Sequence, residues 1–489
     1  MHKKLLKFAA PIALLMTSSA VLAMPFDSFD PRSMAMGTTG VAVGDPSLAP
    51  FFNPAMLTAS DPSKKYSIEF PIIGGRLYDP SNMHTNLQTL SDNVNALNAS
   101  VTTANANASS TNSATIKLLP GNMNTVATNL DAVNNSLKSM SNQPLQGEFG
   151  AATVVGVPGK NWGFAFYADA WAAMGGTLEY NDATTLSNLS TSVKSAANIL
   201  NGASSTASTA CSAVQAGTGT TTDVTNCLAA ANNLNSSLGT ASNAVNFNTN
   251  TTLQSKIHIR GLLVEETGLS VSHSLSTSDH SWSLGFTPKV MNLTLFDALL
   301  SANNGSSTSN VTSNDYTAKY STVNFDMGVA KSYNNGWRTG VVVKNVIPQS
   351  FNYMSIGSNP AGSAQSVTGT LNMNPQARLG VSHENAWSTV ALDADMTRND
   401  PAGLENASQF VGLGGELSAW GWAQLRAGYR ADLLNPGQEL ISVGLGLSPR
   451  IPYFKPHLDL AVSVSKDAFT NGLNNATQAG VALKAGFNF

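Results

Sequence analysis

The chain has 489 residues, of which 42% are hydrophobic and only 11% are charged, and its formal net charge at pH 7 is -3. Soluble globular domains carry about 25% charged residues, so this composition argues against an ordinary water-exposed surface. A charge so close to neutral also gives no electrostatic basis for binding nucleic acid, and no nucleic-acid partner is expected.

Residues 1–23 have the pattern of a secretory signal peptide. Three lysines precede an apolar run at residues 8–16, and residues 21–23 form a small-residue cleavage site. No later stretch of the sequence contains the roughly 18 uninterrupted apolar residues that a membrane-spanning helix needs. We therefore expect an exported chain that begins at Met24 and has no helical anchor.

Residues 24–62 precede the first predicted strand. The run SMAMGTTGVAVGDPSLAPFFNPAML at residues 33–57 is almost uncharged and is punctuated by glycine and proline. Proline resists both helix and central-strand formation, so this segment is predicted to be irregular.

Along the rest of the chain, apolar residues recur at every second position, which is the signature of β-strands. We predict fourteen strands, at residues 66–73, 147–157, 162–174, 256–275, 281–295, 317–333, 336–347, 375–384, 387–397, 409–418, 421–432, 438–447, 456–466 and 478–489. Long and short connections alternate between them, as in outer-membrane barrels with short periplasmic turns and long external loops. Residues 63–489 are therefore predicted to form an all-β fold, a transmembrane antiparallel β-barrel.

Two predicted external loops, residues 74–146 and 175–255, are far longer than the others. Their central parts, 82–145 and 181–254, are rich in Asn, Ser, Thr and Ala, with aliphatic residues three or four positions apart. This spacing fits weak amphipathic helices, but Asn, Ser and Thr are poor helix formers, so mobile loops with a few helical turns are an equal alternative. Low-complexity decoration is the commoner explanation of such a composition, with a receptor role as the alternative.

The two cysteines, Cys211 and Cys227, both lie in the second long loop. In an oxidising compartment they are expected to form one disulfide on the outer face. A free-thiol or metal-binding role is the less favoured alternative, because no histidine cluster or second cysteine pair accompanies them.

Charged residues fall on the polar faces of the predicted strands. They are Glu69, Asp326, Arg338, Lys344, Arg378, Asp393, Asp395, Arg426, Arg430 and Lys484. A lipid-facing position tolerates such charges poorly, so their side chains are predicted to point into the barrel lumen. We favour a structural ion network that braces the wall over the alternative, a substrate-selective site.

The sequence contains no constellation that indicates an enzyme. Gly-x-Ser-x-Gly is absent, the seven histidines are scattered, and no cluster has metal-ligand spacing. A barrel enzyme is the remote alternative, and no cofactor or metal is expected.

Three stretches carry a family likeness: DPRSMAMGTTGVAVGDPSLAPFFNPAML at residues 30–57, VVVKNVIP at 341–348, and the terminal AGFNF. They resemble the FadL-like outer-membrane proteins, which move hydrophobic molecules. Within that group the chain is most similar to the exported proteins labelled conjugal transfer protein TraF. The resemblance implies the outer membrane of a Gram-negative bacterium, with membrane lipid and a small hydrophobic ligand as partners. It also implies that the barrel assembly machinery recognises Phe489.

In FadL-like proteins the N-terminal segment forms a hatch inside the barrel, so the resemblance implies the same for residues 24–62. The glycines would allow close approach to the wall and positive φ angles. The two phenylalanines would lie against the wall, and the Asn-Pro pair would turn the chain toward the first strand. The candidate hatch and gate residues are Gly37, Gly40, Gly44, Phe51, Phe52, Asn53, Pro54 and Ala55.

The resemblance favours a channel for hydrophobic compounds. The alternative is a structural envelope component associated with conjugal transfer, without transport activity. A plug that only stabilises the barrel is as well supported as a moving gate. A continuous apolar pocket beside the hatch would favour transport, whereas a plugged, salt-bridged interior would favour the structural role.

Overall fold

The computed structural model describes residues 22–23, 29–43, 49–59, 66–110, 113–245, 254–276, 280–301, 314–357, 359, 362–401, 403–418, 420–449, 455–472 and 476–488. Most of the predicted signal peptide, together with Gly44 and Phe489, lies outside the described residues. At the edge of the predicted cleavage site, β1 (Leu22–Ala23) pairs in parallel with β13 (Arg398–Asn399).

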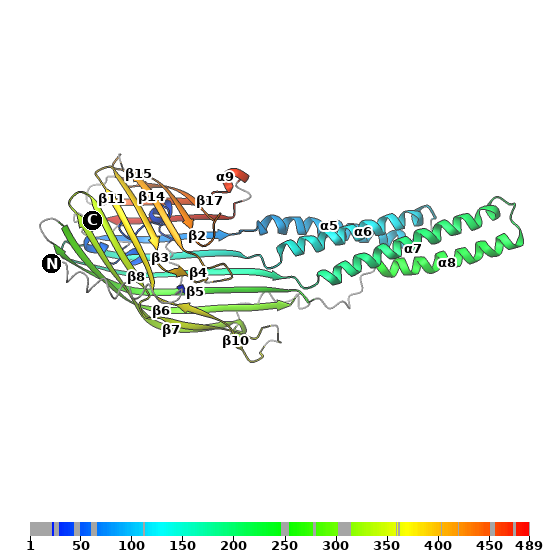
Figure 1. Ribbon diagram of the computed structural model, residues 1–489, viewed down its shortest axis with the longest axis horizontal. Coiled ribbons are helices and arrows are strands. Elements are labelled where there is room, and N and C mark those ends of the chain that lie inside the picture. The colour runs from blue at the N-terminus through cyan, green and yellow to red at the C-terminus, as the bar shows by residue number, and fades with distance from the viewer. Residues whose placement is uncertain are drawn as a thin grey trace.

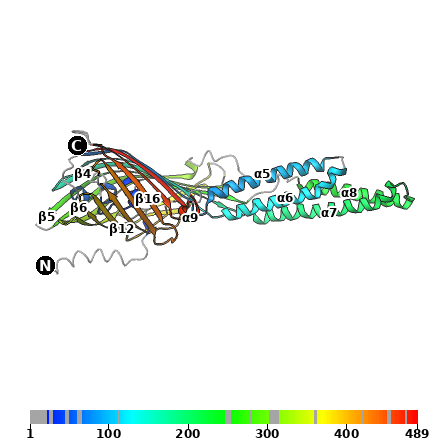
Figure 2. The ribbon, with the colours of Figure 1, turned by 90° about the horizontal axis from the view of Figure 1, so that it is seen from above.

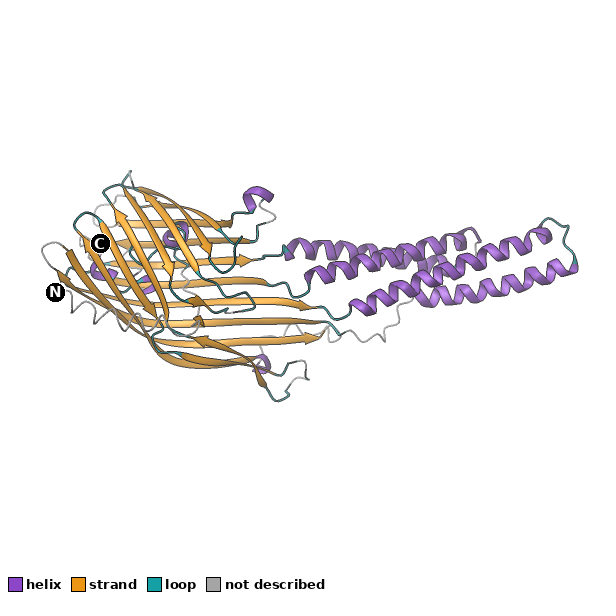
Figure 3. Cartoon of the chain, viewed as in Figure 1, coloured by secondary structure: helices purple, strands orange, loops and turns teal. Residues whose placement is uncertain are grey.

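Fourteen strands close into one antiparallel barrel (Figure 1, Figure 3). In order around the wall they are β2 (Ser67–Tyr78), β3 (Leu145–Val157), β4 (Trp162–Glu179), β5 (Lys256–Ser276), β6 (His280–Ser301), β7 (Thr317–Tyr333), β8 (Trp337–Lys344), β11 (Gln376–Glu384), β12 (Ser388–Asp395), β14 (Phe410–Leu417), β15 (Ala423–Asp432), β16 (Leu440–Leu447), β17 (Lys455–Ser465) and β18 (Gln478–Asn488). Pairing of β18 with β2 closes the wall. The predicted barrel of fourteen strands is confirmed. However, β2, β4 and β6 continue past residues 73, 174 and 295, where the predicted strands end.

The wall of the barrel is apolar outside and polar or small inside. On β17, Leu458, Leu460 and Val462 are exposed on the outer face, whereas Asp459 and Ala461 are buried. Exposed aromatic side chains gather at the strand ends that the short turns connect: Trp162, Trp282, Tyr333, Trp337, Trp387, Trp420 and Trp422. An apolar band next to an aromatic girdle is typical of barrels that span a bilayer.

The connection at residues 348–374, where the sequence predicts no strand, is a hairpin. It contains β9 (Gln349–Ser355) and β10 (Ser366–Met373). The hairpin packs on inward faces of β5 and β6 that have become apolar at the loop end, in a cluster that includes Leu262, Val264, Met291, Leu293, Leu295, Phe351, Tyr353, Leu371 and Met373. Their outward neighbours Glu265 and Asn292 are exposed. The polar and apolar faces are thus exchanged, as expected for sheet that has left the membrane and faces water on its outer side.

The two longest loops form a helical bundle that extends from the barrel along its axis (Figure 1, Figure 2). Its helices are α5 (Met83–Ala108), α6 (Ser113–Met140), α7 (Ala183–Gln215) and α8 (Thr221–Val245). They share a buried core of Ala104, Leu119, Met123, Val126, Ala127, Val193, Ala196, Ala197, Leu200 and Ala241. Burial of this stripe outweighs the weak helix propensity of the Asn, Ser and Thr on the outside. The alternative of mobile loops with a few helical turns is therefore wrong.

A disulfide joins two helices of the bundle near their connecting turn. Cys211 on α7 and Cys227 on α8 are bonded, with their Cα atoms 4.6 Å apart. Two smaller elements, the 3-10 helix η4 (Asn314–Tyr316) and α9 (Ala468–Asn471), lie in other connections of the barrel. Among the described residues, no helix combines the length and the apolar character that crossing a membrane requires.

Candidate functional site: a plug inside the barrel

Residues 29–43 and 49–59 lie inside the barrel, and we call them the plug. They contain three short helices, α2 (Pro31–Ala35), α3 (Ala49–Phe52) and α4 (Met56–Ala59). The first helix contacts β15 to β18, whereas the other two contact β4 to β7. The plug therefore bridges distant parts of the wall.

Proline and an acidic cap explain where the first plug helix begins. Pro31 stands at its first position, where the missing N–H costs no hydrogen bond. Asp30 precedes it, and its carboxylate accepts a hydrogen bond from the Ser33 N–H at 2.7 Å. The same Asp30 side chain reaches the wall through its other oxygen, so the cap that starts the helix also anchors it.

Six charged side chains form a continuous chain of ion pairs whose two ends both lie on the plug. Lys484 bridges Asp30 and Asp459, with Nζ–O distances of 3.2 and 3.4 Å. Glu416 pairs with Arg32 at 2.9 Å and with Arg426 at 2.6 Å. Since Arg426 also binds Asp459, the order is Asp30, Lys484, Asp459, Arg426, Glu416 and Arg32. Three acids balance three bases in this charge chain, which reduces the cost of burying them.

A second contact joins the wall to the backbone of the plug. The carboxylate of Asp393 accepts hydrogen bonds from the N–H groups of Gly40 and Val41, at 2.7 and 2.9 Å. Arg378 pairs with Asp395 at 2.6 Å and donates to the Thr38 carbonyl at 3.3 Å. Hydrogen bonds that involve a charged group are stronger than neutral ones, so this region of the plug is held firmly.

Asn53 connects three parts of the site and is fully buried. Its Nδ2 donates to the carbonyls of Val41 and Val329, at 3.0 and 3.2 Å, and its Oδ1 accepts from the Ala55 N–H at 3.1 Å. It thus joins the two described parts of the plug to each other and to β7. The predicted role of Asn53 is to turn the chain toward the first strand, and that prediction does not include these hydrogen bonds.

Glycines of the wall let the plug approach the strands. A Cβ atom added to Gly285 would lie 2.2 Å from the Ala55 nitrogen, and one added to Gly328 would lie 2.0 Å from Asn53 Oδ1. The same is found against other parts of the plug at Gly150, Gly163, Gly340, Gly380, Gly412, Gly414, Gly428 and Gly444. A larger residue at these positions would force the plug backbone or a plug side chain to shift, since these distances are well below normal contact.

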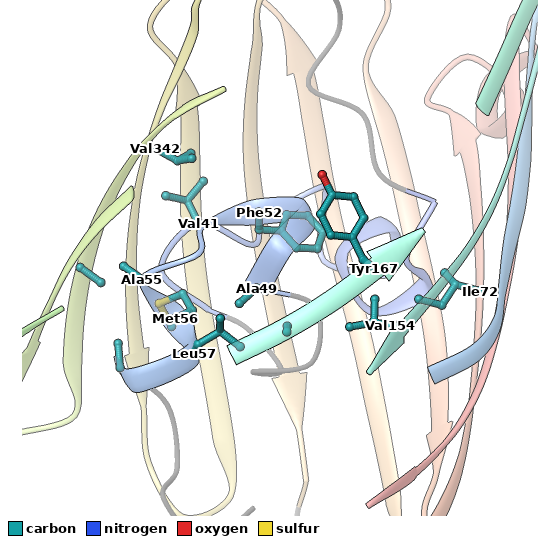
Figure 4. Close-up of a cluster of buried hydrophobic side chains, with 13 residues drawn as sticks. Val41, Ala49, Phe52, Ala55, Met56, Leu57, Ile72, Val154, Tyr167 and Val342 are labelled. Carbon is teal, nitrogen blue, oxygen red and sulfur yellow. The ribbon is translucent and has the colours of Figure 1, made fainter. Parts of the chain in front are cut away.

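An apolar cluster surrounds the second part of the plug (Figure 4). Its plug members include Val41, Phe52, Ala55, Met56 and Leu57, and its wall members include Ile72, Val154, Tyr167 and Val342. Phe51 meets the Tyr167 ring edge-on, with ring centroids 5.2 Å apart. A cavity of about 30 Å³ beside Phe51 is lined mainly by apolar residues of the plug, β3 and β4. This volume is enough for water-sized groups only.

The predicted hatch residues have different surroundings from one another. Gly37 has a positive φ of 67°, as expected, and a Cβ there would lie 2.4 Å from the Tyr429 carbonyl oxygen. Gly40 is not among the glycines with positive φ; it makes room for the Phe52 ring, which lies 2.2 Å from its hypothetical Cβ. Phe51 contacts Tyr167 of the wall, and Phe52 packs on Gly40 of the plug within the cluster that also contains wall residues. Ala55 faces Gly285, and Pro54 lies beside it.

The predicted lumen charges are buried or half-buried on the inner wall, in several separate groups. Arg426 belongs to the charge chain, Asp393 and Arg378 form hydrogen bonds with the plug backbone, and Asp395 pairs with Arg378. Asp326 pairs with Lys289 at 3.2 Å. Arg430 lies over the Phe410 ring at 4.2 Å, and Arg338 pairs with Glu384 near a short turn. The ion networks therefore fit the favoured interpretation, bracing of the wall, and extend it to the plug.

Sequence reasoning missed the plug's own charges, Asp30 and Arg32, and their wall partners Glu416 and Asp459. It also missed the wall glycines and the hydroxyl of Ser272, which donates to the Ala55 carbonyl at 3.2 Å. The period-two pattern contained the signal, because all these wall residues fall on inward positions. Only the path of the plug reveals which inward positions meet it.

Comparison with known proteins gives one family and several distant structural neighbours. The family model described as "F plasmid transfer operon, TraF, protein" matches residues 50–395. The Ralstonia pickettii toluene transporter TbuX is 12% identical, with a TM-score of 0.42 over 95% of this chain and 98% of that one. A Pseudomonas aeruginosa FadL homologue is 8% identical, with a TM-score of 0.44 over 96% and 99%. The CymD monoaromatic hydrocarbon channel is 12% identical, with a TM-score of 0.44 over 95% and 98%. No curated protein matches the sequence.

Proposed function

The chain belongs to the TraF family of the F plasmid transfer operon, and from this premise and the geometry of the plug we propose that it is a channel for hydrophobic compounds in the outer membrane of a Gram-negative bacterium. The plug is the gate of this channel. Membrane lipid surrounds the barrel, a small hydrophobic molecule is the ligand, and assembly proceeds through recognition of the C-terminal residue by the barrel assembly machinery.

The observation that carries the proposal is the apolar contact between the second part of the plug and the wall. The side chains of Phe51, Met56 and Leu57 are apolar and pack in the cluster that joins this part of the plug to the wall. Because the barrel is closed by strand pairing alone, this part of the plug can leave its position without opening the wall. Movement there exposes aromatic and aliphatic side chains, which suits an apolar ligand.

A reversible lock on the plug tests the proposal. A Cβ on Gly163 would lie 2.8 Å from the Leu57 Cβ, within about 1 Å of the separation in native disulfides. We expect the double variant Leu57→Cys, Gly163→Cys to block uptake of the hydrophobic dye N-phenylnaphthylamine when oxidised. Reduction should restore uptake, whereas the uptake of neither single variant should differ between the oxidised and the reduced condition.

Two outcomes of the same experiment would contradict the proposal. If cells that express the wild-type barrel take up no more dye than cells without it, the channel is absent. If the oxidised double variant transports as well as the reduced one, the plug is not the gate.

A second candidate is a structural envelope component that takes part in conjugal transfer without transport. The family description, the continuous charge chain that ties the plug to the wall, and the small volume of the cavity beside Phe51, about 30 Å³, favour it. In that case, deletion of the protein lowers plasmid transfer frequency. Expression of the oxidised Leu57→Cys, Gly163→Cys double variant in the deletion strain then restores transfer as fully as expression of the wild type does. A channel that supports transfer would fail this complementation.

A further inference from the structure

A polar cavity of about 80 Å³ lies in the lumen at the loop end of the strands. Its walls come from β2, β3, β14, β15 and β18, from Gln438, and from Asp400, Glu405, Asn406 and Ser408 in the connection after β13. Drug-sized ligands need about 300 Å³ or more, so this cavity has room for a functional group or a very small molecule. It is chemically unlike the apolar cluster that surrounds the second part of the plug.

Carboxylates outnumber guanidiniums in the lining of this cavity. Four carboxylates face two guanidiniums, which leaves an excess of negative charge: Glu148, Asp400, Glu405 and Asp432 against Arg76 and Arg430. Part of this charge is neutralised within the wall, since Arg76 pairs with Glu148 at 3.4 Å. An anionic ligand would meet the remaining carboxylates, whereas a cationic one would be attracted by them.

Gln146 supplies a buried acceptor without a partner. Its side chain is 2% exposed, and its Nε2 donates to the Glu148 carboxylate at 3.2 Å, which fixes the orientation of the amide. The other amide atom, Oε1, makes no hydrogen bond with any of the residues that the structure describes. A buried acceptor left in this state is costly, and a donor brought by a ligand would remove that cost.

Asp400 adds a second buried acceptor to the lining of the cavity. It belongs to the connection after β13, outside the membrane-spanning strands, and it is 8% exposed. Burial raises the pKa of its carboxyl to about 6, although a hydrogen bond from Asn372 acts in the other direction. A positively charged neighbour would compensate the cost of its ionised form.

We propose that this cavity binds a primary ammonium group, with Gln146 Oε1 and the Asp400 carboxylate as its acceptors. An ammonium group has three donors and no acceptor, which matches two buried acceptors in a lining with excess carboxylate. The group comes either from a small free amine or from the polar end of an amphipathic amine whose body extends into the lumen. Binding at this site does not depend on the proposed transport.

Binding to the purified full-length barrel in detergent tests the assignment by calorimetry. The probes are methylamine, 2-phenylethylamine and 3-phenylpropanoate, which present a free amine, an amphipathic amine and an anion of similar size. We expect 2-phenylethylamine to bind at least about tenfold more tightly than 3-phenylpropanoate, the effect of one hydrogen bond to a charged group. Equal affinity for methylamine and 2-phenylethylamine identifies a site for free amines, and tighter binding of the latter identifies a headgroup site.

Variants at Gln146 decide whether the cavity is the place of binding. Gln146→Leu should weaken amine binding about tenfold, and Gln146→Glu should strengthen it, while Gln376→Leu should leave it unchanged. Gln376 is an equally buried glutamine on β11, engaged by Asn399 and outside the cavity. Asp400→Asn serves as the second weakening variant if Gln146→Leu does not fold.

Three results overturn the assignment: no probe binds, the anion binds as tightly as the amines, or both Gln146 variants bind amines like the wild type. None of them bears on the channel, because dye uptake through the barrel is measured separately. Conversely, a barrel that transports no dye can still bind amines here.

Discussion

The two described parts of the plug are held by different chemistry. Residues 29–43 are fixed by the charge chain and by carboxylate hydrogen bonds to backbone N–H groups. Residues 49–59 are held by apolar packing, by close approach to wall glycines and by hydrogen bonds to the wall that are mostly neutral, the bond from Lys344 to the Phe51 carbonyl being the charged exception. Ion pairs and charge-assisted hydrogen bonds specify one position, whereas apolar contacts tolerate sliding and repacking. The difference indicates that residues 29–43 fix the plug, whereas residues 49–59 can be released from the wall. We call residues 29–43 the anchor and residues 49–59 the releasable part.

The largest expected effect comes from breaking the anchor. Arg426→Met removes the middle of the charge chain, although Glu416 keeps Arg32 and Asp459 keeps Lys484. Loss of one member of a buried ion network costs about 3 kcal/mol. We expect the heat-induced conversion of the folded gel band to occur at a markedly lower temperature.

Arg338→Met is the matched control for the anchor. Arg338 also pairs with a glutamate, but its side chain and that of Glu384 are 18% and 40% exposed. Exposed pairs contribute about 0–1 kcal/mol, so the conversion temperature should hardly change. Equal shifts for the two variants would show that the charge chain does not anchor the plug more firmly than a surface pair.

A smaller effect on stability, and the largest on permeability, is expected at Gly285. In Gly285→Ala the new methyl would overlap the plug backbone at Ala55, at 2.2 Å. Such overpacking costs about 1–3 kcal/mol, and the releasable part of the plug should move away from the wall. We expect increased uptake of N-phenylnaphthylamine by cells that contain the variant barrel.

Gly147→Ala on β3 is the control for this substitution, because a Cβ there would have no atom within 4 Å. It should leave dye uptake at the wild-type level. If Gly285→Ala also leaves uptake unchanged while the barrel is correctly inserted, residues 49–59 are as firmly placed as residues 29–43. The proposed difference between the two parts of the plug would then be wrong.

The barrel could be predicted from the sequence because its determinants are local. Alternation along each strand identifies the lipid-facing side, and alternating loop lengths identify the two ends of the barrel. The bundle could not be predicted in the same way. Its helices are stabilised by contacts between α5, α6, α7 and α8 that no single segment reveals, and the local propensity of Asn, Ser and Thr points the other way.

Only the part of the site that lies on the strands could be predicted, because only strand residues follow a local pattern. Inward charges such as Asp393 and Arg426 are recognisable because they cannot face lipid. Asp30 and Arg32 lie in a segment without a period, so nothing in the sequence places them near particular strands. The role of wall glycines such as Gly285 is equally hard to predict, because the sequence does not show which segment packs on a glycine at an inward strand position.

The smallest expected effect tests the aromatic contact of the releasable part. Phe51→Leu keeps an apolar side chain beside β4 but removes the edge-on contact with Tyr167, which has a centroid distance of 5.2 Å. Such aromatic pairs contribute about 1 kcal/mol beyond their buried area, equivalent to about a fivefold change in the ratio of open to closed plug. We expect a modest rise in dye uptake and an almost unchanged conversion temperature. Phe286→Leu is the control, since Phe286 forms a similar pair with Phe325 at 5.3 Å on the outer face of the barrel, away from the plug. If both substitutions change uptake equally, the contact of Phe51 with Tyr167 has no special part in gating. A rise confined to Phe51→Leu assigns the releasable part to residues 49–59, because the charge chain is intact in both variants.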